Sequence, residues 1–314
     1  MGSEKFDVLA VGDGCLDVIL TGLDGGLEEK QVLRGCAQHV IPGGGFTTPV
    51  VLQWLGVKVT WAADFGSDII SKFIQKTAED EGVDLHYSRL LKRNARRISV
   101  SLSTLKNRSF LSYEDASPFV PAAFHGLLCA KATAVYMPGT RLDKLFLLGA
   151  RIARFRNMTI IVDGNGADKY RLDQNVVKQC LQYIDILILN TDEALSITEE
   201  NAPENALIRL AALSKQVVMK DGANGALFLD KGEVRHVPAI PVAAVDTTGA
   251  GDNFNAGFIA AWLRGKTVEE CAAWGNITAG LSTTVPGGAT MKIYLNDILS
   301  WMQRYPEMEE GWKF

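Results

Sequence analysis

Residues 246–258 read DTTGAGDNFNAGF, and the apolar stretch that follows them predicts a helix. Gly249 and Gly251 allow the backbone to turn sharply and to approach a ligand closely, because glycine has no Cβ. The amide groups that open the predicted helix form a site for an anion such as a phosphoryl group. Asp252 lies in the first helical turn, where its carboxylate can accept the proton of an attacking hydroxyl group. An ordinary glycine turn, with an acidic residue that favours the helix dipole, is the alternative interpretation.

Short apolar runs rich in Val, Ile and Leu alternate with longer amphipathic stretches along most of the chain. The runs that predict strands are 6–12, 58–63, 133–138, 159–163, 185–190, 217–220 and 226–229. The stretches that predict helices are 68–82, 141–157, 171–183, 203–214, 250–264, 268–284 and 291–304. Continuous apolar strands are typical of a parallel sheet that is covered on both faces. We therefore expect one α/β domain over residues 1–314, with a doubly wound, mostly parallel sheet flanked by helices.

Two regions of the chain, residues 14–41 and 94–119, break this alternation. Within the second region, residues 97–103 alternate polar and apolar side chains with a period of two. That alternation is typical of a sheet with one face in water. We predict that the two regions together form a small β lid over an edge of the main domain.

Composition and charge indicate which kinds of partner to expect. The 314 residues are 47% hydrophobic, enough for a large core, and 32 basic against 36 acidic residues give a net charge of −4. This even mixture argues against a nucleic-acid or membrane-surface partner and favours a small molecule. The five cysteines are scattered and show no metal-type spacing. With no apolar run of membrane-spanning length and no apolar signal-peptide core, we expect a cytoplasmic protein with reduced thiols.

Polar residues and glycines also follow other predicted strands. Asp17 comes after the first strand, whose carboxyl end is where open α/β sheets bind ligands, so its carboxylate can hold substrate hydroxyls. Gly43 and Gly44 belong to a second glycine turn that runs into an apolar helix. Asn190 and Glu193 follow a later strand, and a carboxylate there can hold Mg²⁺ through water. A turn, a flexible loop and a helix cap are the respective alternatives.

With these motifs in this order, the chain resembles the ribokinase-like, or PfkB, family of carbohydrate and nucleoside kinases from Asp17 to Gly288. The resemblance implies a doubly wound α/β domain with a β lid that closes over the substrate and often mediates dimerisation. It also implies transfer of the γ-phosphoryl group of ATP to a hydroxyl group, with Asp252 as the catalytic base. The positions that match the anion hole of the family are Gly249, Ala250 and Gly251.

The same resemblance assigns binding roles and cofactors. The positions that match substrate-binding residues of the family are Asp17, Gly43 and Gly44. The matches to its magnesium- and phosphate-associated element are Asn190 and Glu193, and those to its nucleotide loops are Lys220, Gly222, Gly225 and Gly288. Asp246 and Thr248 lie where ribokinases hold a monovalent cation. The implied cofactors are thus ATP and Mg²⁺, with K⁺ left open, and a homodimer through the lid is left open too.

Departures from the family pattern concern the substrate. Thr48 stands where the family usually has Asn, and Cys15 replaces a polar residue that is common in ribokinase, which weakens an assignment of ribose. Ala167 stands where Arg is often found, which weakens a phosphorylated or carboxylated substrate. Lys220 occupies a position where Thr is frequent, and a direct phosphate contact is the expectation for it.

We therefore expect an ATP-dependent kinase that acts on a sugar or a sugar-like molecule. A nucleoside kinase of the same fold is the first alternative, with Phe46, Phe110 and Tyr113 as candidates for stacking on a base. A non-catalytic sugar-binding regulatory protein that has kept the fold is the second.

Overall fold

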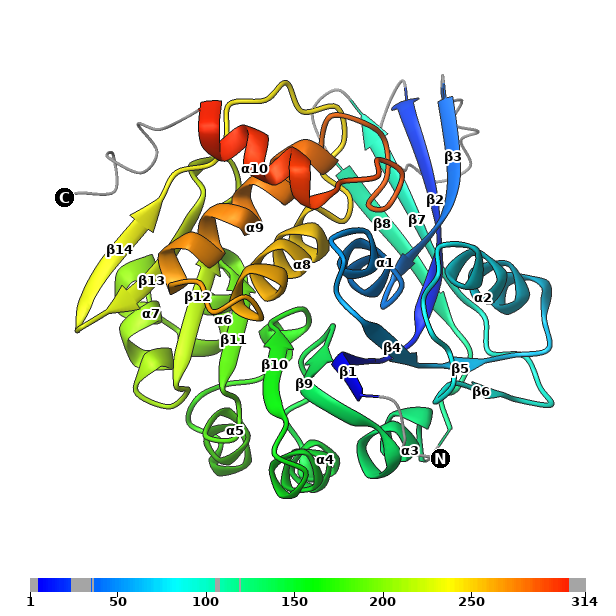
Figure 1. Ribbon diagram of the computed structural model, residues 1–314, viewed down its shortest axis with the longest axis horizontal. Coiled ribbons are helices and arrows are strands. Elements are labelled where there is room, and N and C mark those ends of the chain that lie inside the picture. Colours follow the sequence, from blue (N-terminus) through cyan, green and yellow to red (C-terminus); the bar gives the residue numbers. More distant parts are fainter. Residues whose placement is uncertain (1–4, 24–34, 36, 105–107, 119, 305–314) are drawn as a thin grey trace, which may run out of the picture.

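The computed structural model describes residues 5–23, 35, 37–104, 108–118 and 120–304. In these ranges, helices cover both faces of a large central sheet (Figure 1). The eight described strands of this sheet, in spatial order, are β14 (Glu233–Val237), β13 (Ala226–Asp230), β12 (Gln216–Lys220), β11 (Ile186–Asn190), β10 (Thr159–Asp163), β9 (Lys131–Met137), β1 (Lys5–Val11) and β4 (Val59–Ala62).

The large sheet is parallel from β4 to β12, and β12, β13 and β14 pair antiparallel. The doubly wound, mostly parallel sheet that the sequence predicts is therefore confirmed. Strand β14, which no apolar run indicated, is short and only partly buried at the edge of the sheet. Because the parallel strands end at the same edge, the terminal residues of β10, β11 and β12 lie near one another: Asp163, Asn190 and Lys220.

Two apolar clusters pack on opposite faces of the sheet, because side chains alternate along each strand. On β1, Val8 and Ala10 belong to one cluster, whereas Leu9 and Val11 belong to the other. The helices of the first cluster are α1 (Thr47–Trp54), α2 (Ile69–Asp80), α8 (Ala250–Trp262), α9 (Val268–Ser282) and α10 (Leu295–Arg304). Those of the second are α3 (Ala122–Cys129), α4 (Lys144–Phe155), α5 (Asn175–Leu181), α6 (Thr191–Thr198) and α7 (Pro203–Ala211).

A second sheet lies beside α1 and α2 (Figure 1). Its four described strands, in spatial order, are β3 (Ala37–Gly44), β2 (Gly14–Leu23), β7 (Arg97–Thr104) and β8 (Arg108–Glu114). They come from the two regions of the predicted lid, and β3 continues past the predicted boundary to Gly44. Within the two regions of the predicted lid, residues 24–34, 36, 105–107 and 119 lie outside the described ranges. A short pair, β5 (Asp64–Phe65) and β6 (Arg89–Leu90), completes the strands.

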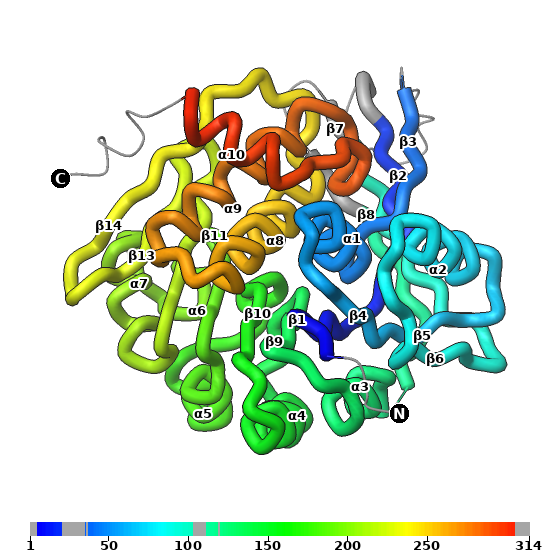
Figure 2. Tube along the Cα trace, viewed as in Figure 1, coloured from blue at the N-terminus to red at the C-terminus, as the bar shows by residue number. Residues whose placement is uncertain are grey.

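The chain path brings its early and late parts together at one point. In Figure 2, α1 from the blue part of the chain lies against α8 from the orange part, and the two helices pack on each other. Strand β3 leads directly into α1 through the glycine turn at residues 42–45. This packing brings that glycine turn close to the N-terminus of α8. Among the described helices, none is both long enough and apolar enough to cross a membrane.

Candidate active site

The N-terminus of α8 contains the second half of the glycine-rich motif at residues 246–258. Gly249 caps the helix with φ of 70°, a left-handed conformation that glycine adopts without strain. Ala250, Gly251 and Asp252 form the first turn, so their backbone N–H groups lie at the positive end of the helix dipole. The structure therefore has a glycine-capped helix N-terminus at the predicted position, with Asp252 in its first turn.

A second glycine loop packs directly on this turn. A Cβ on Gly249 would lie 2.5 Å from Cα of Gly288, so the two backbones approach as closely as they do because neither has a side chain. The buried side chain of Asn253 holds them together, because its Nδ2 donates to the carbonyl oxygens of Gly249, at 2.9 Å, and of Gly288, at 2.5 Å. Asp246 adds a further link, since its Oδ2 accepts from the backbone N–H of Gly287 at 2.8 Å.

Asp246 also orders the loop that leads into α8. Its Oδ1 accepts from the backbone N–H of Thr248 at 3.0 Å and from the Thr248 hydroxyl at 2.8 Å. The structure thus places Asp246 and Thr248 next to the loop that contains Gly288. The carboxylate is nearly buried, at 8% exposed.

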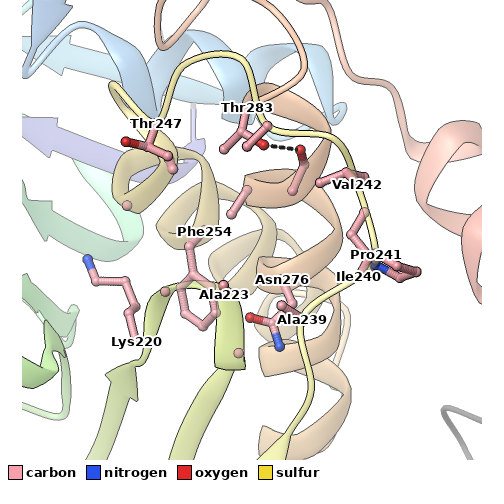
Figure 3. Close-up of a pocket in the computed structure, with 17 residues that line it drawn as sticks. Lys220, Ala223, Ala239, Ile240, Pro241, Val242, Thr247, Phe254, Asn276 and Thr283 are labelled. Atoms are coloured by element: carbon pink, nitrogen blue, oxygen red, sulfur yellow. Dashed lines mark hydrogen bonds between the residues drawn. The ribbon is translucent and has the colours of Figure 1, made fainter. Parts of the chain in front are cut away.

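A cavity of about 390 Å³ opens beside the N-terminus of α8 (Figure 3). Three predicted nucleotide-loop residues line it: Lys220 at the end of β12, and Gly222 and Gly225 on the turn between β12 and β13, which contains the short helix η2 (Gly222–Asn224). Figure 3 shows Lys220 on the side of the cavity away from Ile240 and Val242. Ala250 and Gly251 also contribute to the lining. The cavity thus combines an apolar wall with an anion-binding helix end and an ammonium group.

On the other side of Asp252 lies the predicted substrate side, where β2 and β3 pair. A Cβ on Gly43 would collide with Oδ2 of Asp17, so the glycine leaves the space that this carboxylate occupies. The thiol of Cys15 donates to Oδ1 of Asp17 at 3.1 Å. Burial raises the pKa of Cys15, and the nearby Asp17 and Asp252 carboxylates raise it further, so the thiol stays neutral. Gly44, with φ of 59°, packs its backbone against the same sulfur.

Thr48 connects the glycine turn to the Asp252 carboxyl group. Its buried hydroxyl lies 3.4 Å from Oδ1 of Asp252, 3.2 Å from the Asp252 carbonyl oxygen and 3.1 Å from the hydroxyl of Tyr136. Burial raises the pKa of Asp252 to about 7, and the carboxylates of Asp163 and Asp17 add to this increase, while Lys220 opposes it. A carboxyl group with a pKa near neutrality suits a general base.

Three polar residues at this site were not predicted as site residues. Asn255 Nδ2 donates to Oδ2 of Asp163 and, at 3.0 Å, to the hydroxyl of Tyr136. Lys220 Nζ lies 3.4 Å from Oδ2 of Asp163. Asp163 could have been found, because it ends a predicted strand at the ligand-binding edge of the sheet. The sequence carries no comparable signal for Tyr136, which looks like any other apolar core residue of β9.

Asn190 and Glu193 form a helix cap, which was the alternative interpretation of this segment. Glu193 N–H donates to Asn190 Oδ1, and Asn190 N–H donates to Glu193 Oε2, both at 2.8 Å. Neither residue lines the cavity. Burial raises the pKa of Glu193, and Asp163 adds to this effect, while the Asn190 amide and Lys220 oppose it. Glu193 therefore lies in the same electrostatic environment as Asp163.

The described part of the chain contains no group of three or more His, Cys, Asp or Glu side chains that could hold a metal ion. Mg²⁺ usually keeps several waters and takes one or two carboxylates together with substrate phosphates. A single carboxylate such as Glu193 is compatible with that kind of site.

The aromatic residues that were candidates for stacking on a base have other surroundings. Phe46 is buried and packs edge-on against Trp61 in the core. The hydroxyl of Tyr113 donates to Asp115 Oδ1 at 2.8 Å, and its ring lies beside Arg96. The side chain of Phe110 lies outside the described part of the chain.

A model of the family described as pfkB family carbohydrate kinase matches residues 5–293. This chain belongs to the pfkB family. It is 26% identical over 269 residues to the ribokinase of Haemophilus influenzae, with 82% of this chain and 86% of the relative covered. It is also 26% identical over 267 residues to the 2-dehydro-3-deoxygluconokinase of the same organism, with 78% and 85% covered.

Solved structures show the same fold for this pfkB-family chain. The structure of Arabidopsis thaliana ribokinase complexed with ribose and ATP superposes with a TM-score of 0.79 at 23% identity, covering 96% of this chain and 99% of that one. The nucleoside kinase of Methanocaldococcus jannaschii superposes with a TM-score of 0.76 at 17% identity, covering 97% and 100%. The predicted family and the ribokinase-like fold are therefore confirmed. Because the names of these proteins differ in the acceptor, the comparisons define a class of carbohydrate kinase and leave the substrate open.

Proposed function

We propose that this protein transfers the γ-phosphoryl group of ATP to a hydroxyl group of a sugar or sugar-like molecule. The position of Asp252 carries this proposal. Its carboxyl group, with a pKa raised to about 7, lies next to Gly251 on the cavity wall and within electrostatic reach of Asp17 on the other side. A base between an anion site and a hydroxyl-binding carboxylate is the arrangement that phosphoryl transfer to an alcohol requires.

On the nucleotide side, the cavity is the proposed site for ATP. Its apolar wall suits the adenine base, and the N–H groups of Gly249, Ala250 and Gly251 suit the γ-phosphate. Lys220 faces the phosphates with its ammonium group, while Gly222 and Gly225 let the backbone come close. The similar fold of the Arabidopsis thaliana ribokinase, whose structure contains ATP, supports this assignment.

On the acceptor side, the substrate hydroxyl faces Asp252, and Asp17 holds neighbouring hydroxyls in the space that Gly43 and Gly44 leave open. The second sheet acts as a lid over this substrate. Because phosphoryl transfer depends mainly on positioning and charge stabilisation, closure of the lid contributes along with the base.

Two metal ions complete the proposal. Glu193 would hold Mg²⁺ through water, and the ion would neutralise charge on the nucleotide phosphates. Asp246 and Thr248 would hold a monovalent cation such as K⁺, which would offset the charge of the nearly buried Asp246 carboxylate. Asn190 supports the first site indirectly, because its cap fixes Glu193.

The proposed surroundings are the cytoplasm, and the proposed assembly is a homodimer through the second sheet. Exposed apolar side chains on this sheet support the dimer: Val40 on β3 and Leu111 and Tyr113 on β8 are 45%, 63% and 51% exposed. Light scattering of the purified protein at several concentrations measures the mass, and a monomer at all of them would contradict this assembly.

ADP release by the purified protein with magnesium and ATP tests the function. The panel of acceptors contains pentoses, hexoses, sugar acids, glycated amines and nucleosides, each with and without K⁺. Strong turnover with one class of sugar is the expected result. Turnover with nucleosides alone would favour the nucleoside kinase, and sugar binding without ATP consumption would favour the regulatory protein.

A further inference from the structure

A continuous set of polar side chains, buried except for the partly buried Lys220, runs from the cavity to the Asp252 carboxyl group. Its members, which we call the buried polar network, are Lys220, Asp163, Asn255, Tyr136 and Thr48. They come from β12, β10, α8, β9 and α1, so five elements that are distant in sequence contribute one residue each. Polar groups in a core cost free energy unless they bond one another, and here each member has a partner within the network.

Asp163 is the anionic centre of this network. Its carboxylate is 4% exposed, and it accepts hydrogen bonds from Asn255 Nδ2 and from Lys220 Nζ. An isolated carboxylate at such a position would be costly to bury, and the Lys220 ammonium group, the Asn255 amide and the backbone N–H of Asn165, which donates to Oδ1 at 3.0 Å, offset that cost. In return, Asp163 and the Asn255 carbonyl oxygen, each 3.4 Å from Nζ, fix the position of Lys220.

The network reaches the two reacting sides of the site. Lys220 lines the cavity, and its Nζ lies 3.2 Å from the position that a Cβ on Gly251 would occupy. Asn255 follows Asp252 by three residues on α8, so the two side chains project from neighbouring positions on one face of the helix. At the other end, the Thr48 hydroxyl lies between Tyr136 and Asp252.

We propose that Asp163 is a positioning residue for phosphoryl transfer, which holds Lys220 at the nucleotide cavity and acts through its charge on Asp252. This inference rests on the proposed kinase function. Asp163 contacts neither the nucleotide nor the acceptor in this scheme. When the nucleotide binds, Lys220 has two anionic partners within reach, the Asp163 carboxylate and the phosphates, and it bridges them.

Several titratable groups face Asp252 and together determine its pKa. The titratable ones are the carboxyl groups of Asp163 and Asp17, the ammonium group of Lys220, the thiol of Cys15 and the phenol of Tyr136. Asp163 and Asp17 raise the pKa of Asp252, and Lys220 lowers it. The two partners in the Asp163–Lys220 ion pair thus act on the base in opposite directions.

Because Asp163 and Lys220 shift the pKa of Asp252 in opposite directions, removing either charge should shift the pH profile of the enzyme. A purely structural role of Asp163 would not produce such a shift. The pH dependence of kcat/KM for the accepted sugar is measured from about pH 5 to about pH 9, at saturating magnesium and ATP. The acidic limb of this profile is the fall in kcat/KM below neutral pH. In Asp163→Asn, which keeps the shape of the side chain and removes its charge, this limb should move to lower pH by roughly one unit. In Lys220→Met, which keeps the length of the side chain, the limb should move to higher pH, and KM for ATP should rise about tenfold.

Tyr136→Phe is the matched control, because it removes a hydroxyl group from the same network without changing its charge. Its acidic limb should stay where the wild-type limb is. Limbs that do not move in Asp163→Asn and Lys220→Met, or that move in the same direction, would overturn the inference while leaving the kinase function intact. Absence of turnover by the wild type across the whole panel would contradict the kinase function and the inference with it. Thermal unfolding shows whether Asp163→Asn folds. If it does not fold, the direction in which the acidic limb of Lys220→Met moves decides whether the inference stands.

Discussion

The proposed nucleotide side and the proposed acceptor side of this site are built from different parts of the polypeptide. Glycines in two loops line the cavity, Gly222 and Gly225 in one and Gly251 in the other. Gly249 and Gly288 pack on each other beside it. On the acceptor side, the groups are side chains from distant elements, namely Asp17 on β2, Thr48 on α1 and Asp252 on α8. A site made of backbone suits a ligand that is common to a family, whereas a site made of side chains can change its substrate one residue at a time.

Asp252→Asn should produce the largest effect, because it removes the proposed base, which lies between the two sides. We expect kcat to fall by about 10³-fold, within the range that a general base contributes. ATP affinity, measured by calorimetry, should stay within about twofold of the wild type, because the cavity is unchanged. Turnover like that of the wild type would show that Asp252 is not the base.

Gly249→Ala tests the nucleotide side and should have the next largest effect. The new Cβ would collide with Gly288 and separate the two glycine loops, so we expect kcat/KM for ATP to fall by roughly 10²-fold. Gly265→Ala is the matched control, because Gly265 has a similar φ, 73° against 70°, and has open space around its Cα. This control should lose about 1 kcal/mol of unfolding free energy to backbone strain and keep its activity. Equal activities of the two variants would show that the contact between the loops has no function.

Gly43→Ala tests the acceptor side. Its Cβ would displace the Asp17 carboxylate, so KM for the sugar should rise roughly tenfold while KM for ATP stays the same. Gly149→Ala, in α4 on the opposite face of the large sheet, provides the control, because its Cβ would make only ordinary contacts. If both KM values of Gly43→Ala rise together, the two sides are not separate as we describe them.

The pH dependence of the wild type should show the smallest effect. Because the pKa of Asp252 is raised to about 7, this carboxyl group is increasingly protonated below neutrality and can no longer accept a proton. We therefore expect kcat/KM for the sugar to fall roughly fivefold from pH 7 to pH 6 and to level off at higher pH. A rate that is constant down to about pH 5 would mean that another group takes the proton.

The contrast between the two sides also explains what could be predicted from the sequence. The parallel strands could be predicted from apolar runs, since both of their faces are buried. The glycine turns could be predicted because the glycines of each turn lie close together in the sequence. In the structure, the two glycine turns around Gly249 and Gly288 pack on each other. The described strands of the second sheet also fall in the two regions from which the sequence predicts a lid, although β3 runs further, to Gly44.

The buried polar network could not be predicted, because its members are far apart in sequence. Asn255 and Asp163 meet only after β10 and α8 have packed, and nothing local marks them as partners. Phe46 shows the opposite problem. It lies next to a glycine turn, which made it a candidate for stacking, but tertiary packing places it in the core.

Following the phosphorus through the reaction tests the central claim most directly. Phosphorus NMR of the wild-type protein with magnesium, ATP and the accepted sugar would identify the product and measure its amount. Our account predicts a sugar phosphomonoester in an amount equal to the ADP released, and neither product above background with Asp252→Asn. Free inorganic phosphate in place of the phosphomonoester, or sugar binding with no loss of ATP, would contradict it.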